Sequence, residues 1–262
     1  MISALKGRLS AAAQDLLQNF MLACARDLDV TGEAGPSLVL APHPDDESLG
    51  CGATIARLRS RGQRVHIVIV TDGAACGRSS VIGPKEIAAI RRKETQNAAA
   101  ALGVPPEDVI FFQFPDQHAG EQAQAIEAAL GEEINRVKPR QIFSPYGVDA
   151  HPDHRVVAAA IDRLFQKGLV ACPVYEYPIW FWPYGAVSHL IQPHKLMRLR
   201  RVQAQDFLVP KKVAIAAHRS QNVALTDEAG WFTLPERFVQ RCLSPFELFF
   251  EKTVAKKCNI ED

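Results

Sequence analysis

Apolar runs of four to six residues alternate with longer amphipathic stretches through the middle of the chain. The clearest run, residues 65–70, is nearly continuous in β-branched side chains, as expected for a parallel strand that is buried on both faces. Strands of the same kind are predicted at residues 37–40, 109–114 and 141–146. Helices are predicted between these strands and after the last one, at residues 47–61, 84–102, 121–137 and 153–166. Such alternation gives right-handed βαβ units and a doubly wound sheet.

The two ends of the chain are less regular. Residues 1–30 carry apolar side chains at helical spacing, which predicts an amphipathic helix, and residues 27–36 form a polar connector. We expect this helix to pack on the domain surface, and a helix that binds a partner or a membrane surface is the alternative. In the last third, strands are predicted at residues 174–177 and 246–251, and a helix at residues 211–220.

A segment dense in aromatic and proline residues spans positions 178–184. We expect it in the core or at a rim, with a lip that stacks on a sugar or contacts a lipid as the alternative. The basic stretch at 195–201 is expected to be a solvated face or a strand edge. With no internal repeat or low-complexity linker, we predict a single-domain α/β protein with a three-layer, Rossmann-like fold and a mostly parallel sheet. Its N-terminal helix and connector (1–36) precede the main domain (37–262).

Composition narrows the possible functions. The chain has 262 residues, of which 47% are hydrophobic and 23% are charged, and these values are ordinary for one large globular domain. The formal net charge of +1 gives no reason to expect a nucleic-acid partner. Six cysteines are scattered without a Cys-x-x-Cys pair, which argues against a cysteine-based zinc site and a disulfide framework. Neither a signal peptide nor an uncharged apolar run of about 20 residues is evident, so we expect a cytoplasmic protein without a transmembrane segment.

The residues after the first strand form the first candidate site. The sequence APHPDDE (41–47) places a histidine and three acidic residues on a tight loop between a strand and a helix. Its two prolines restrict the backbone. In open α/β sheets, sites lie beyond the carboxyl ends of the strands, where this loop is predicted. Alone, the motif could equally be a polar turn in which Asp45 or Asp46 caps the following helix.

A second polar cluster, DAHPDH (149–154), also follows a predicted strand and leads into a helix. Two loops of this kind can converge on one metal ion. Catalytic zinc typically takes three ligands from His, Asp and Glu and leaves one position open. His43, Asp46 and His154 would form such a set, but by residue type alone Asp45 or His151 would serve as well. A nucleotide-binding module lacks support, because no Gly-x-Gly-x-x-Gly motif follows the first strand.

Together the two motifs resemble those of the PIG-L/LmbE family of zinc-dependent deacetylases, which act mostly on N-acetylglucosaminyl groups. The resemblance covers about residues 37–168 and, less closely, residues 211–222, and the paired motifs are much more specific than a lone His-x-x-Asp. It implies that His43, Asp46 and His154 are the metal ligands. Zn²⁺ suits this mixed nitrogen and oxygen set, and other divalent transition metals are alternatives.

The resemblance also agrees with catalytic roles for three neighbouring residues. Asp45 would take a proton from the metal-bound water, whose pKa a metal lowers to about 7. His151 would be the protonated partner that stabilises the oxyanion or donates to the leaving amine. Asp153 would orient an imidazole and raise its pKa. Some family members carry a tyrosine just before the second motif as an extra oxyanion donor, whereas this chain has Asp149 there.

Substrate contacts are expected from three further residues. Asp116 matches a family position that lines the substrate cleft, with a turn aspartate as the alternative. Arg78 could reach a phosphate or a sugar hydroxyl, with a surface charge as the alternative. His218 belongs to a late motif near the cleft and is expected either to contact substrate or to be a packed or capping histidine. Arg91 and Glu94 match an Arg-x-x-Glu helix pair, which we interpret as a structural i, i+3 pair.

We therefore expect a zinc-dependent hydrolase that removes the acetyl group from an N-acetylated amino sugar of the N-acetylglucosamine type. Its expected partner is that small-molecule substrate, free or linked to a lipid or polymer. An amide hydrolase of the same fold that acts on another N-acyl amine, such as a thiol-cofactor or antibiotic-type conjugate, is the first alternative. A non-catalytic module that binds metal or sugar is the second, and the complete set of motif residues argues against it.

Overall fold

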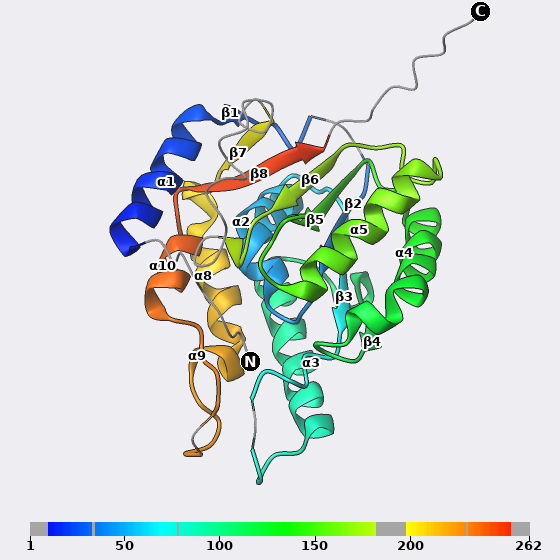
Figure 1. The fold of residues 1–262 in the computed structure, drawn as a ribbon. Helices are drawn as coiled ribbons and strands as arrows, with labels where there is room; N and C mark the ends of the chain where they lie inside the picture. Colours follow the sequence, from blue (N-terminus) through cyan, green and yellow to red (C-terminus); the bar gives the residue numbers. More distant parts are fainter. Residues whose placement is uncertain (1–9, 33–34, 78, 182–197, 229, 253–262) are drawn as a thin grey trace, which may run out of the picture.

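The computed structural model describes residues 10–32, 35–77, 79–181, 198–228 and 230–252. The strands of this part of the chain are β1 (Arg26–Asp27), β2 (Ser37–Ala41), β3 (Val65–Thr71), β4 (Val109–Phe114), β5 (Gln141–Pro145), β6 (Val174–Tyr177), β7 (Leu199–Gln203) and β8 (Phe246–Lys252). They form one sheet in the order β1-β7-β8-β6-β5-β2-β3-β4. The strands from β6 to β4 are parallel neighbours, and β8 is antiparallel to β6 and β7. The predicted single α/β domain with a mostly parallel sheet is thus confirmed (Figure 1).

Helices cover both faces of this sheet. They are α1 (Ala11–Cys24), α2 (Asp46–Ser60), α3 (Pro84–Ala101), α4 (Ala123–Val137), α5 (Pro152–Gln166), α8 (Leu208–Ala217), α9 (Arg219–Asn222) and α10 (Glu236–Cys242). None of the helices in the described residues is long and apolar enough to cross a bilayer.

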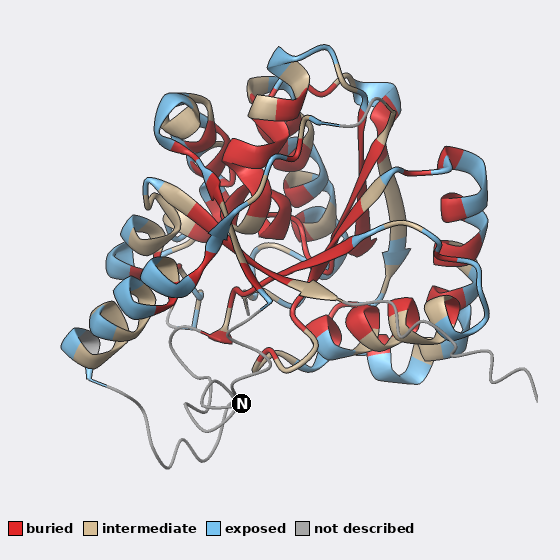
Figure 2. Cartoon of the chain, turned by 90° about the horizontal axis from the view of Figure 1, so that it is seen from above, coloured by how far each residue is buried: buried red, intermediate tan, exposed pale blue. Residues whose placement is uncertain are grey.

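Strand β2 shows why the apolar runs are continuous. Leu38 and Leu40 join the core under α4 and α5, whereas Val39 and Ala41 join the core under α2, α3 and α8. Successive side chains of a strand point to opposite faces, so a strand between two helix layers needs apolar residues at every position. Figure 2 shows the result, with buried strands lying between helices whose outer faces are exposed.

The order of the strands creates a crevice beside β2. From β2 the chain passes through α2 to β3 and through α3 to β4, and it then returns through α4 to β5 on the other side of β2. The neighbouring strands β2 and β5 therefore lead into helices on opposite faces of the sheet. Ligands of doubly wound folds bind at such a switch point, beyond the carboxyl ends of the strands. The two sequence motifs leave this pair of strands, so the fold brings them together.

Differences from the predicted elements lie mainly at the two ends of the chain. The N-terminal helix ends at Cys24, and Arg26–Asp27 form a short strand beside β7. Met21 is fully buried against residues of β7 and β8, so the helix packs on the domain as expected. Residues 1–9 lie outside the described residues.

The basic stretch at 195–201 contributes a strand that we expected at most as an edge. Strand β7 lies inside the sheet between β1 and β8, with Leu199 and Val202 fully buried. The arginines interrupt the apolar pattern of this strand, and Arg201 pairs with Asp27, a residue 174 positions away, at 2.7 Å. In the aromatic segment, Ile179 and Phe181 are buried, and residues 182–184 lie outside the described part of the chain.

Candidate active site

Three polar atoms from the two motifs meet at the carboxyl edge of β2 and β5. The Oδ2 atom of Asp46 lies 3.2 Å from Nδ1 of His43 and 3.1 Å from Nε2 of His154. The two nitrogen atoms lie 3.3 Å apart, and all three side chains are buried. Tetrahedral zinc with bonds of about 2.0–2.1 Å has ligand atoms about 3.3 Å apart. These three donors therefore have the chemistry and the spacing that one zinc ion requires.

The first motif folds back on the start of α2 to present its donors. The backbone N–H of His43 donates to Oδ2 of Asp46 at 2.9 Å, which fixes the first residue of the helix against the loop. On the other side of its ring, Nε2 of His43 lies 3.2 Å from Oδ1 of Asp116 and 3.2 Å from Oδ2 of Asp153. A histidine whose second nitrogen faces carboxylates is the usual arrangement around a metal ligand.

The second motif places His154 in the first turn of α5, which Pro152 opens. Nδ1 of His154 lies 3.5 Å from Oδ1 of Asp149. The second oxygen of Asp149 accepts the backbone N–H groups of Ile179 at 3.0 Å and Phe181 at 3.2 Å. Nδ1 of His154 makes no hydrogen bond within the described residues, so Asp149 acts on this ring through its charge. Asp149 also ties the second loop to the segment after β6, a role that the sequence analysis did not assign.

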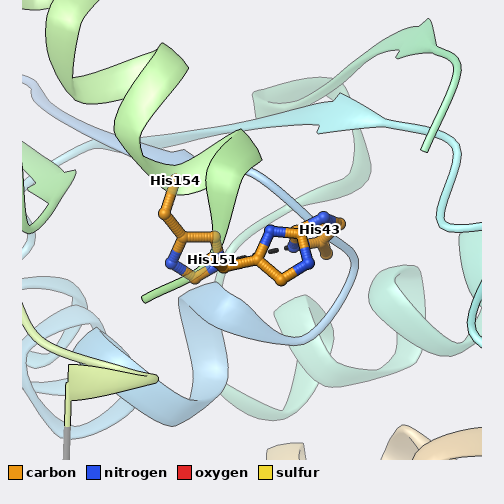
Figure 3. Close-up of side chains that lie close together, drawn as sticks. All are labelled: His43, His151 and His154. Carbon is orange, nitrogen blue, oxygen red and sulfur yellow. Dashed lines mark hydrogen bonds between the residues drawn. The ribbon is translucent and has the colours of Figure 1, made fainter. Parts of the chain in front are cut away.

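Two other groups of side chains lie close enough to share a cation. One consists of His43, Asp116 and Asp153, and the other of His43, His151 and His154, which surround one point in Figure 3. In the first, Asp116 and Asp153 already accept the backbone N–H groups of Ala75 and Gln117. In the second, Nδ1 of His151 accepts the N–H of Asp153 at 3.2 Å. Oδ2 of Asp46 likewise accepts the backbone N–H of His43, so bonds to the backbone do not separate the three sets. The set of His43, Asp46 and His154 is distinguished by its three donor–donor distances of 3.1–3.3 Å, which match the spacing of ligands around tetrahedral zinc.

The charges of the site favour a bound cation. Burial alone would raise the pKa of Asp46, but His154 and His43 hold it well below its usual value. Burial likewise opposes a charge on His43, yet Asp116, Asp153 and Asp46 raise its pKa well above the ordinary range. In the metal-free protein, protons on the imidazoles thus balance buried carboxylates. Binding of a metal ion would release such protons.

Asp45 lies beside these donors in an unusual backbone conformation. Its φ of 132° falls in a region that residues other than glycine rarely adopt, and such strain tends to occur at functional sites. Its side chain makes no helix-capping bond and instead accepts from Nη2 of Arg91 at 3.2 Å. Burial raises the pKa of Asp45 to about 7, against the opposing effect of Arg91. A carboxyl group with a pKa near neutrality is suited to accept a proton.

His151 differs from its predicted charge state. Burial and the nearby imidazoles of His43 and His154 lower the pKa of His151 to about 3, so the ring is neutral at pH 7. Because its Nδ1 accepts the N–H of Asp153, the proton of the neutral ring belongs on Nε2. A neutral ring of this tautomer can still donate one hydrogen bond. His151 is also only half-buried, so the site is open to solvent on its side.

Comparisons with known proteins identify the family of the segment that carries both motifs. Residues 38–165 match the PIG-L family, described as GlcNAc-PI de-N-acetylase. This part of the chain belongs to the PIG-L family. The "Uncharacterized deacetylase YaiS" of Escherichia coli is 31% identical over 140 residues, which are 52% of this chain and 66% of that protein. The "Probable N-acetyl-alpha-D-glucosaminyl L-malate deacetylase 2" of Bacillus cereus is 28% identical over 201 residues, 73% of this chain and 86% of that one.

A solved structure is similar in fold to nearly the whole chain. The solved N,N'-diacetylchitobiose deacetylase from Pyrococcus horikoshii superimposes with a TM-score of 0.65 and covers 94% of each chain at 20% sequence identity. At this identity the likeness concerns the fold alone. It includes the parts of the chain beyond residues 38–165, where β6, β7 and β8 complete the sheet.

The three predicted substrate residues differ in where they lie. Asp116 lies at the site, within 3.2 Å of His43. His218 is buried, and its Nε2 lies 2.8 Å from Oε1 of Glu47. Arg78 lies outside the described residues.

One structural interpretation was wrong. Arg91 and Glu94 do not pair with each other: Arg91 donates to Gly73, Pro44 and Asp45, whereas Glu94 accepts both the backbone N–H and the hydroxyl of Ser220. The sequence showed their spacing but not their long-range partners.

Proposed function

We propose that this PIG-L domain is a metal-dependent hydrolase that removes the acetyl group from an N-acetylglucosamine-type conjugate. The observation that carries the proposal is the triangle of donor atoms from His43, Asp46 and His154, together with the buried carboxylate of Asp45, the residue before Asp46. The names of the relatives support an N-acetylated sugar as the substrate class.

His43, Asp46 and His154 would hold the metal, for which zinc is the best fit by donor type and spacing. When bound, zinc supplies Lewis acidity, which lowers the pKa of water and polarises a carbonyl group. Asp45 would carry out the proton transfers. Asp45 accepts the proton of the attacking water, and a carboxyl group with a pKa of about 7 is suited to return it to the leaving amine. General acid–base catalysis of this kind contributes about 10²–10⁴-fold in rate.

Two further residues, His151 and Asp116, would contact the substrate, and Asp153 would support the site. Nε2–H of neutral His151 would donate to the carbonyl oxygen as negative charge develops there. Asp153 would hold His43 in place through the contact of 3.2 Å to its Nε2. Burial would raise the pKa of Asp116, but His43 holds this pKa below its usual value. The carboxylate of Asp116 would therefore accept a hydrogen bond from a sugar hydroxyl at the edge of the site.

The test combines metal content with amine release. Protein purified without chelators is measured for zinc and incubated with N-acetylglucosaminyl malate and N,N'-diacetylchitobiose as probes, as wild type, Asp45→Asn and Asp108→Asn. Asp108 is an equally buried carboxylate, bound by Arg64 before β4 and remote from the site. We expect about one zinc per chain in all three proteins and a loss of about 10²–10⁴-fold in kcat for Asp45→Asn only.

Each failure has a separate meaning. Absence of zinc, with none taken up on addition, would refute the metal site. Zinc without release of amine from any N-acetyl sugar would move the substrate to another class of N-acyl amine. Equal rates for wild type and Asp45→Asn would remove Asp45 from the mechanism.

A further inference from the structure

Glu47 lies at the centre of a buried chain of hydrogen bonds directly behind the site. Its Oε2 accepts the backbone N–H of Asp45 at 3.0 Å. Its Oε1 lies 2.8 Å from Nε2 of His218 and accepts the hydroxyl of Ser48 at 2.7 Å. Glu47 and Ser48 are fully buried, and His218 is 1% exposed. The carboxylate is therefore satisfied by protein groups on both oxygens and does not serve as a solvated charge at the helix N-terminus.

The bond to the N–H of Asp45 acts where the backbone is strained. Asp45 has a φ of 132° and precedes α2 without capping it. A residue rarely keeps this conformation unless its surroundings hold it there. Glu47 supplies such a hold on the main chain, while Arg91 holds the carboxylate at 3.2 Å. The backbone and the side chain of the proposed base are thus fixed by two separate partners.

His218 is itself held firmly. It lies where α8 ends and α9 begins, and its carbonyl oxygen accepts the N–H of Gln221 at 3.0 Å and the side-chain amide of Asn222 at 2.8 Å. Two residues further on, Ser220 donates its N–H at 2.8 Å and its hydroxyl at 2.6 Å to Glu94. Glu94 lies one turn from Arg91 on α3. The contacts thus link Asp45 to α9 through Glu47 and His218, and to α3 through Arg91, and Ser220 and Glu94 connect these two helices.

We propose that His218 is a positioning residue for Asp45 and acts through Glu47. This inference rests on the proposed function, in which Asp45 is the base. A direct contact between His218 and substrate does not fit its burial or the engagement of its Nε2 by Glu47. A displacement of a catalytic group by about 1 Å can cost about 10²-fold in rate. Loss of the His218 contact should therefore lower kcat while leaving KM and the metal in place.

The first test compares three single variants on whichever of the two acetylated probes the wild type hydrolyses. His218→Leu removes the donor, and His218→Gln restores an N–H donor at a similar reach. His66→Leu is the matched control, because His66 is also buried, at 3% exposure, but lies on β3 away from the loop. We expect kcat to fall about 10²-fold for His218→Leu, to recover by at least tenfold in His218→Gln, and to stay near wild type for His66→Leu.

A second readout does not depend on activity. Hydrogen exchange of the Asp45 amide should accelerate in both His218→Leu and Glu47→Gln. In the first variant the Glu47 carboxylate loses the partner that fixes it, and in the second the carboxylate that accepts the Asp45 N–H is replaced. It should stay slow in His66→Leu. If the wild type hydrolyses neither probe, the proposed substrate class fails, and the exchange rates still decide whether His218 holds the loop.

Three results would overturn the inference. They are an unchanged kcat in His218→Leu, an equal defect in His218→Gln and His218→Leu, and a defect that is explained by lost zinc or by raised KM alone. Should His218→Leu fail to fold, Glu47→Gln gives the same decision. It keeps the shape of the side chain but leaves one acceptor oxygen for the three donors of Asp45, Ser48 and His218, so the same fall in kcat at constant KM is expected.

Discussion

Two loops leave neighbouring parallel strands and supply one site, yet they are held in different ways. In the second loop, His151 has an ordinary φ of −77° and caps α5 by accepting the N–H of Asp153. In the first loop, Asp45 has a φ of 132° and makes no cap. Arg91 of α3 and Glu47 of α2 hold it instead. The start of α5 thus follows the local rules of helix capping, whereas the strained residue before α2 depends on a neighbouring carboxylate and on a guanidinium from another helix.

This contrast suggests a division of labour. The first loop carries both the proposed metal donor, Asp46, and the proposed base, Asp45, and these adjacent carboxylates face different partners. The second loop carries His154, whose support comes from Asp149. Damage to the supports of the first loop should therefore appear mainly in the rate, and damage to the supports of the second loop mainly in metal affinity.

The largest effect is expected from Asp46→Asn, compared with its neighbour in Asp45→Asn. Asp46→Asn removes the only anionic donor of the triangle, so zinc content should fall well below one ion per chain. Activity should fall at least as far as after loss of a general base, which costs about 10²–10⁴-fold in rate. Elemental analysis and amine release measure the two outcomes. Full zinc content in Asp46→Asn would refute its role as a ligand.

Metal removal should reveal whether the loops share one ion. Zinc at about 100 times its Kd stabilises a folded protein by about 2.7 kcal/mol, which corresponds to a rise in Tm of about 5–10 °C for a chain of this size. Chelation should reverse this rise and accelerate hydrogen exchange in both loops, at residues 42–46 and 149–154. Faster exchange in one loop alone would contradict a shared site.

Asp149→Asn should weaken the second loop specifically. The amide keeps an acceptor for the N–H groups of Ile179 and Phe181 but loses the charge that faces His154. Loss of such a supporting contact typically weakens metal binding by about 10–100-fold. Zinc titration should show this change, with kcat near wild type once zinc is saturating. An unchanged Kd, or a fall in kcat that zinc does not restore, would oppose the division of labour.

The smallest effects are expected from two glycines with similar backbones. Gly73 has a φ of 66°, and a Cβ there would lie 2.7 Å from Nη1 of Arg91 and 2.8 Å from Cδ of Pro44. Gly62 has a φ of 74° and open space. Both alanine variants carry backbone strain of about 1–2 kcal/mol, or roughly 2–8 °C in Tm. Gly73→Ala should also lower kcat, because Arg91 must shift.

Gly62→Ala serves as the control for that pair. Its Tm should fall by the strain alone, and its kcat should match that of the wild type. Thermal unfolding and steady-state kinetics measure both quantities. Equal kinetics in the two variants would show that Arg91 does not depend on the close approach of Gly73.

The sequence by itself determined the central fold and the composition of the site. Continuous apolar runs specify strands that are buried on both faces, and their alternation with helices leaves few ways to order the sheet. Two polar motifs after two strands predicted that their histidines and carboxylates converge, and the family resemblance implied His43, Asp46 and His154 among them. These signals are local in the chain, because strand and helix periods and the ends of strands can be read from neighbouring residues.

Only the tertiary structure decided how these groups are held. Arg91 and Glu94, three positions apart on one helix, bond to different distant segments. Asp149 bonds the segment after β6. The charge state of His151 also depends on imidazoles brought to it by another strand. Such contacts join residues up to 171 positions apart, and their energies depend on burial and on partners that sequence spacing does not specify.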